Sequence, residues 1–207
     1  MRIGCVVMAS GAGARFTAAG GVGEKLMANV CGAPLIARTV ASVPRDRFEL
    51  VLSTRSQAVA SAAEQAVPDL RVVLHDAEER SASIKVGLML GSDEWDGCLF
   101  LPGDQPLVSQ ASFEALARAF ERFPRQAWRL AWQGAPASPV LFPRLCFGAL
   151  VDLQGAEGGS HVLRSGLVPQ GFVEAQSPDE LWDVDTTDDL RHVAACYAER
   201  LGCTTAR

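Results

Sequence analysis

The chain has 207 residues, 48% of them hydrophobic and 21% charged, which suits a single globular domain with a substantial core. Its net charge of −5 argues against nonspecific nucleic-acid binding, which needs clustered Lys and Arg. No segment is apolar over the ~18 residues that cross a bilayer, so we expect no membrane association.

Strand-like and helix-like segments alternate along the chain. The predicted strands are 3–9, 48–53, 71–74, 98–101, 128–132, 139–142 and 168–175. The predicted helices are 33–43, 55–66, 81–90, a long helix capped by Ser109, 144–151, 158–165 and 187–200. Repeated β–α units predict an α/β fold with a mostly parallel sheet covered on both faces. We find no linker, so we expect one domain over residues 1–207, with an end that frays after Leu201.

The cysteines give no sign of a metal site or a redox motif. They lie at positions 5, 31, 98, 146, 196 and 203, without a C-x-x-C pair or zinc-like spacing. We expect reduced thiols in a cytoplasmic protein, with Cys5 and Cys98 packed as small hydrophobic residues in buried strands. The amino terminus lacks the long apolar region of a secretory signal.

The loop after the first predicted strand is rich in glycine and carries two cations. It reads Ser10-Gly11-Ala12-Gly13-Ala14-Arg15-Phe16 and continues to Gly20-Gly21-Val22-Gly23-Glu24-Lys25. Glycines at this place let backbone N–H groups turn toward an anion, and Arg15 and Lys25 would offset the charge of a triphosphate. Phe16 breaks a dinucleotide-binding fingerprint, and Glu24 before Lys25 breaks a P-loop. A flexible loop without a ligand is the remaining alternative.

A single carboxylate follows the predicted strand 98–101. The segment reads Leu101-Pro102-Gly103-Asp104-Gln105-Pro106, so Asp104 stands at the strand's carboxyl end between two prolines. Ligands bind at that edge in open α/β sheets, and an acid fixed there can hold a divalent metal. A tight turn with Asp as a turn residue is the alternative interpretation.

Two more polar segments are expected at the same edge. Ser81 and Ser83 open a predicted helix, where their hydroxyls can bond an anion or cap backbone N–H groups, capping being the simpler role for Ser81. Asp183 and Asp185 precede the last predicted helix, and alternation points them the same way. One of them facing Asp104 would complete a two-carboxylate site for Mg²⁺.

Other polar residues nearby have structural interpretations. Asp188 and Asp189 fall in the first turn of the last helix, where they favour the positive end of the dipole, and Thr186 or Thr187 is the expected N-cap. His75 follows a strand and could line the pocket, although a surface or capping role explains it as well.

These motifs resemble, in order along the chain, those of the MobA-like nucleotidyltransferases. Residues 8–15 resemble an L-A-A-G-x-S-x-R opening, 25–26 an N-K-L-L element, 81–88 S-S-S-L-R-A-G-L, 101–106 P-G-D-Q-P, 139–142 P-V-L-F and 183–190 D-I-D-T-x-x-D-L. The Gly-Asp-Gln-Pro element and the Ala-Ala-Gly type of opening favour the branch of molybdenum cofactor cytidylyltransferases.

The resemblance implies a three-layer, doubly wound, Rossmann-like fold of the nucleotide-diphospho-sugar transferase type. It implies transfer of CMP from CTP to a phosphate monoester, the molybdenum-pterin cofactor, with release of pyrophosphate, and a molybdoenzyme or its chaperone as partner. The implied nucleotide-binding residues are Ala9, Ser10, Gly11, Gly13, Arg15, Lys25, Ser81, Ser83 and Gly103. The implied metal ligands for Mg²⁺, or Mn²⁺, are Asp104 and Asp185, and the implied catalytic residues are Arg15, Lys25 and Asp104.

Several positions depart from the family pattern. Ser10 replaces the second Ala of the opening, and Gly13 stands where the family often has Ser. On the acceptor side, the segment 155–160 lacks the Asp and Arg of the family's G-D-x-G-A-R element, and Ser138 replaces a common His. A sugar-phosphate or polyol-phosphate nucleotidyltransferase, and a homologue that binds nucleotide or pterin without turnover, therefore remain as alternatives.

Overall fold

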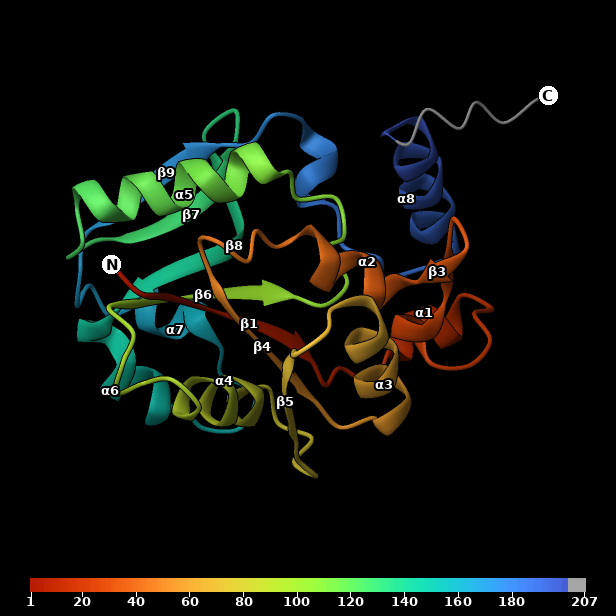
Figure 1. Cartoon of the computed structure of the whole chain (residues 1–207), viewed down its shortest axis with the longest axis horizontal. Helices are drawn as coiled ribbons and strands as arrows, with labels where there is room; N and C mark the ends of the chain where they lie inside the picture. Colours follow the sequence, from red (N-terminus) through yellow and green to blue (C-terminus); the bar gives the residue numbers. More distant parts are fainter. Residues whose placement is uncertain (201–207) are drawn as a thin grey trace.

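The computed structural model describes residues 1–200, which form a helix–sheet–helix sandwich (Figure 1). The strands of its large sheet are β1 Ile3–Ala9, β4 Glu49–Thr54, β5 Arg71–Leu74, β6 Gly97–Pro102, β7 Ala127–Trp132, β8 Ala135–Pro143 and β9 Gln170–Glu174. The helices are α1 Ala14–Ala18, α2 Leu35–Ser42, α3 Gln57–Ala66, α4 Arg80–Met89, α5 Gln110–Arg122, α6 Phe147–Val151, α7 Gly159–Arg164 and α8 Thr187–Arg200. The frayed end expected after Leu201 lies outside the described residues.

The sheet is mostly parallel, as the alternation of elements predicts. Its strand order is β5-β4-β1-β6-β8-β7-β9. β1 lies at the centre of the parallel part and pairs with β4 and β6, while β8 runs antiparallel to both of its neighbours, β6 and β7. The carboxyl ends of β1 and β6 therefore lie side by side. This is the edge at which open α/β sheets bind ligands.

Helices cover both faces of the sheet, which confirms the predicted three layers. Cys5 and Val7 of β1 face a core shared with α2, α3, α5 and α8, while Val6 faces a second core with α4, α6 and α7. Figure 1 shows α5 and α4 on opposite sides of the strands. Cys5 and Cys98 are fully buried free thiols within these cores, as predicted.

The boundaries of several elements differ from those predicted. The helix expected from Ala33 begins at Leu35, because Ala33–Pro34 forms strand β3 and pairs with β2, Asn29–Val30, in a small hairpin. Three short 3₁₀ turns, Lys25–Met27, Arg144–Cys146 and Pro178–Leu181, were not predicted as separate elements, and α1 lies within the loop expected to be irregular. Short elements such as these carry too few residues for a periodic pattern.

Other boundaries agree closely with the prediction. Ser109 caps α5 by accepting a hydrogen bond from the Ser112 N–H at 3.1 Å, and α8 spans the predicted range. None of the helices described in residues 1–200 is both long and apolar enough to cross a membrane.

A glycine brings α4 against the central strand. A Cβ atom built on Gly87 would overlap Cγ1 of Val6, so the helix backbone can lie this close to β1 only without a side chain at that position. Gly148 in α6 has the opposite surroundings, because a Cβ there would meet no atom within 4 Å. The close contact at Gly87 fixes the helix that carries Ser81 and Ser83.

We predict that Gly87→Ala lowers the free energy of unfolding by about 1–3 kcal/mol, the usual cost of overpacking a core. The matched variant Gly148→Ala should leave it unchanged or raise it by up to about 1 kcal/mol, because alanine favours helix over glycine. Urea unfolding followed by circular dichroism measures both. Equal effects of the two substitutions would show that α4 does not depend on close contact with Val6.

Candidate active site at the carboxyl edge of the sheet

Asp104 is fixed against the end of β1. The Gly103 N–H donates to the Met8 carbonyl at 2.9 Å, and the buried Thr39 hydroxyl donates to the Gly103 carbonyl at 2.8 Å. A Cβ on Gly103 would stand 3.0 Å from the Met8 carbonyl oxygen, so the turn needs glycine for this close approach. The turn after β6 is thus a rigid support for the carboxylate.

The segment that carries Asp185 is attached to the same turn. The Val184 N–H donates to the Asp104 carbonyl at 3.1 Å, and the Val184 side chain is fully buried. The Gln105 side chain donates to the Leu181 carbonyl at 3.4 Å and adds a second link. The loop before α8 is therefore held beside the end of β6, as the sequence predicts.

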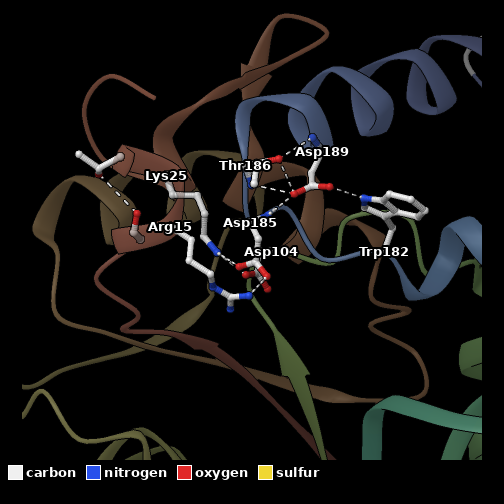
Figure 2. Close-up of polar contacts among 9 residues, drawn as sticks. Arg15, Lys25, Asp104, Trp182, Asp185, Thr186 and Asp189 are labelled. Carbon is white, nitrogen blue, oxygen red and sulfur yellow. Dashed lines mark hydrogen bonds and ion pairs between the residues drawn. The ribbon is translucent and has the colours of Figure 1, made fainter. Parts of the chain in front are cut away.

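Hydrogen bonds to one carboxylate shape the start of α8 (Figure 2). Asp189 Oδ2 accepts from the N–H groups of Asp185 and Thr186 and from the Thr186 hydroxyl, at 2.7 to 3.1 Å, and its Oδ1 accepts from Trp182 Nε1 at 3.0 Å. Burial opposes ionisation of Asp189, but these hydrogen bonds outweigh it and lower its pKa. The Asp189 N–H bonds the Thr186 hydroxyl in return, so Thr186 acts as the helix cap.

Asp104 and Asp185 converge on the ammonium group of Lys25 (Figure 2). Lys25 Nζ lies 2.5 Å from Asp104 Oδ2 and 3.6 Å from Asp185 Oδ1. Arg15 contacts the other oxygen of Asp185, Oδ2, at 2.6 Å, with a side chain that is 78% exposed against 11% for Lys25. The Lys25 contacts are therefore less screened by water than the Arg15 contact.

A third carboxylate adds to the negative charge of this group. Burial and, to a smaller extent, the neighbouring carboxylates of Asp104 and Asp185 raise the pKa of Asp183 to about 6. Asp104 and Asp185 thus share the Lys25 ammonium at the edge of the sheet, and Asp183 adds negative charge nearby. Such an arrangement of hard oxygen ligands suits a divalent cation.

A cleft of about 170 Å³ opens beside these charges. Its lining residues are Met8, Ser10, Gly11, Lys25, Leu26, Glu78, Glu79, Ser83, Pro102 and Asp104. Ser10, Gly11, Lys25, Ser83 and Asp104 are therefore brought together in one cleft. Met8, Leu26 and Pro102 lie in motifs recognised from the sequence but were not expected to line the site, and Glu78 and Glu79 belong to none of these motifs.

His75 links the two serines of the cleft. Its Nε2 lies 2.9 Å from the Ser10 hydroxyl and 3.5 Å from the Ser83 hydroxyl. Burial lowers the pKa of His75, which favours the neutral ring. The surface or capping role considered for His75 is replaced by a role in placing the serines. The role of His75 could not be predicted from the sequence, because His75 follows the strand that ends at Leu74 and the sequence does not determine where its side chain points.

The remaining predicted site residues lie beside the cleft. Ala9 is buried at the end of β1, and Gly13 precedes α1 at a φ of 64°, with Lys25 Cβ only 3.2 Å from where a Cβ would be. Ser81 is buried in the first turn of α4, and Glu79 holds the cap position, so the capping role expected for Ser81 is wrong. The Ser81 N–H instead donates to the Gly155 carbonyl at 3.3 Å.

Known proteins resemble this chain in sequence and in structure. The purine catabolism protein PucB of Bacillus subtilis (strain 168) is 33% identical over 124 residues, which cover 56% of this chain and 57% of that protein. The chain thus matches little more than half the length of this curated relative. Rv0371C of Mycobacterium tuberculosis H37Rv, solved in complex with manganese, is 26% identical with a TM-score of 0.70 over 94% of this chain and 99% of that chain.

A nucleotidyl transferase from Methanothermobacter thermautotroptrophicus has the same fold, with a TM-score of 0.79 and 24% identity over 96% of this chain and 99% of that chain. The sheet, in which β8 runs antiparallel to its neighbours β6 and β7, is thus that of the nucleotide-diphospho-sugar transferase fold. The model of the MobA-like NTP transferase domain matches residues 5–171, a range that contains the glycine-rich loop, Lys25 and Asp104. The chain therefore belongs to the family of MobA-like NTP transferase domains.

Proposed function

We propose that this protein transfers CMP from CTP to a phosphate monoester, the molybdenum-pterin cofactor, and releases pyrophosphate. The observation that carries the proposal is the convergence of Asp104 and Asp185 on Lys25 beside a cleft that begins at the glycine-rich loop. Membership of the NTP transferase family supplies the class of reaction. The choice of CTP and of the pterin rests on the resemblance of the Gly-Asp-Gln-Pro and opening motifs.

The reaction is an in-line displacement at phosphorus. An oxygen of the acceptor phosphate forms a bond to the α-phosphorus of CTP, and the bond from that phosphorus to the bridging oxygen breaks, so that pyrophosphate leaves with the electron pair. A phosphate monoester has a second pKa of about 6 and is largely ionised at neutral pH, so its attack needs no strong base. His75 is therefore assigned to placing Ser10 and Ser83 rather than to proton transfer.

The residues present fit a divalent cation. Asp104 and Asp185 would hold it, because their carboxylates already face a common positive charge, the Lys25 ammonium. When bound, Mg²⁺ or Mn²⁺ supplies neutralisation of the charge on the phosphate oxygens. The manganese complex of Rv0371C supports a divalent ion in a protein of this fold.

The two cations of the loop serve the departing pyrophosphate. Lys25 lines the cleft, and the exposed Arg15 contacts Asp185, which also contacts Lys25. Both are held in place by carboxylates before any nucleotide binds, so their positive charges are positioned in advance of the reaction. Catalysis then depends on positioning and on charge stabilisation.

We predict that Asp104→Asn lowers the turnover of CTP on the order of 100- to 1000-fold, because the position loses its negative charge while its shape is preserved. Manganese binding, measured by electron paramagnetic resonance without substrate, should weaken in the same variant. Asp46→Asn, at an exposed position of a surface turn, is the matched control and should change neither quantity. Near-normal turnover in the Asp104 variant would remove this residue from the mechanism.

A second experiment tests the substrates with the unaltered protein. We predict that pyrophosphate is released with CTP in preference to GTP and ATP, and only when both a divalent cation and the molybdenum-pterin cofactor are present. Release with a sugar phosphate or polyol phosphate in place of the pterin would favour a nucleotidyltransferase of another pathway. Binding of CTP without release under any condition would indicate a homologue that binds nucleotide without turnover.

A further inference from the structure

A second cavity, of about 120 Å³, adjoins the nucleotide cleft. The two share Met8 and Pro102 as lining residues, and Pro102 stands two positions before Asp104. The second cavity lies over the face of the sheet that packs against α4, α6 and α7, because Phe100 and Phe142 of its wall belong to that core. A molecule bound there would lie next to the carboxylates of the active site.

Strand register places a cation in a row with apolar side chains. Arg129 of β7 pairs with Val140 of β8, and Val140 pairs with Phe100 of β6. Directly opposite residues of neighbouring strands share one face of the sheet, so these three side chains lie side by side across the cavity. All three line it, together with the hydroxyl-bearing residues Ser138 and Ser160.

Arg129 is a partly buried cation without a carboxylate partner in residues 1–200. Its Nε donates to the Ala137 carbonyl at 3.2 Å, and no carboxylate of the described residues lies within ion-pair distance of the guanidinium. Burial lowers the pKa of Arg129, because removing the charged guanidinium from water is unfavourable. A bound anion would offset this loss of hydration. A guanidinium presents a planar fork of donors that matches the oxygens of a phosphate.

We propose that this cavity binds the acceptor, with Arg129 pairing with its phosphate and the Phe100–Val140 row packing against a flat, largely apolar remainder. The inference rests on the proposed function and names the class of acceptor as an aromatic or heteroaromatic phosphate monoester. A polyol phosphate fits less well, because hydroxyls that face Phe100 and Val140 would lose hydrogen bonds to water without a partner on that part of the wall. The phosphate then enters the active site from the side of Pro102.

Calorimetric titration of the whole protein with simple probes tests this assignment without turnover. Wild type should bind 4-nitrophenyl phosphate more tightly than glycerol 3-phosphate. Arg129→Met should weaken binding of 4-nitrophenyl phosphate about tenfold or more, the effect of losing a charged hydrogen bond, and leave binding of 4-nitrophenol unchanged. Arg129→Lys should restore part of the loss, which separates the lost charge from a change in folding.

The control variant is Arg118→Met, which removes an exposed arginine of α5 and should leave binding of each probe unchanged. The inference is overturned if wild type binds no probe, if it binds glycerol 3-phosphate as tightly as the aromatic ester, or if Arg129→Met has no effect. It is also overturned if this variant weakens binding of a non-hydrolysable CTP analogue equally, because Arg129 would then belong to the nucleotide site. If the titrations give the expected results but Asp104→Asn turns over CTP at a near-normal rate, the proposed function is rejected and the cavity remains a ligand site.

Discussion

The site depends on the compensation of like charges that the fold forces together. Asp104 and Asp185 would repel each other at the edge of the sheet, and Asp183 adds a third acid whose pKa is raised mainly by burial and also by these two carboxylates. Lys25, with a side chain only 11% exposed, offsets the repulsion through contacts with both carboxylates. A largely buried ion pair of this kind contributes little to stability once the loss of hydration is counted, so its value lies in fixing the positions of the ammonium and of the two carboxylates.

The backbone, rather than the charges, brings the acids together. The Val184 N–H and Asp104 carbonyl bond, and the Gly103 N–H and Met8 carbonyl bond, join the loop before α8 to the ends of β6 and β1. These bonds form because the parallel pairing of β1 with β6 aligns their carboxyl ends. On the right of Figure 1, α1 and α8 lie beyond these strand ends. A substitution of the Asp104 or Asp185 side chain should therefore change the chemistry of the site and leave these backbone hydrogen bonds in place.

Much of the fold follows from the sequence, because the long elements carry clear periodic patterns and one of them begins at a strong signal, the N-cap Ser109. The convergence of Lys25, Asp104 and Asp185 could be expected because all three follow or flank elements that end at one edge. The short helix α1 and the β2–β3 hairpin could not, since neither has enough residues to show a period. The Ser10–His75 contact and the glutamates of the cleft depend on side-chain directions in loops, which local sequence does not determine.

The cavity proposed for the acceptor illustrates how a binding role can rest on a residue outside the family motif. The segment 155–160 lacks the Asp and Arg of the family motif, which by itself suggests a lost site. Ser160 of that segment nevertheless lines a cavity with Arg129, which comes from a strand far away in the chain. Because β7 pairs with β8 and β8 with β6, Arg129 of β7 lines the same cavity as Pro102 of β6. A residue on the cavity-facing side of a neighbouring strand can therefore supply a positive charge that the segment 155–160 lacks.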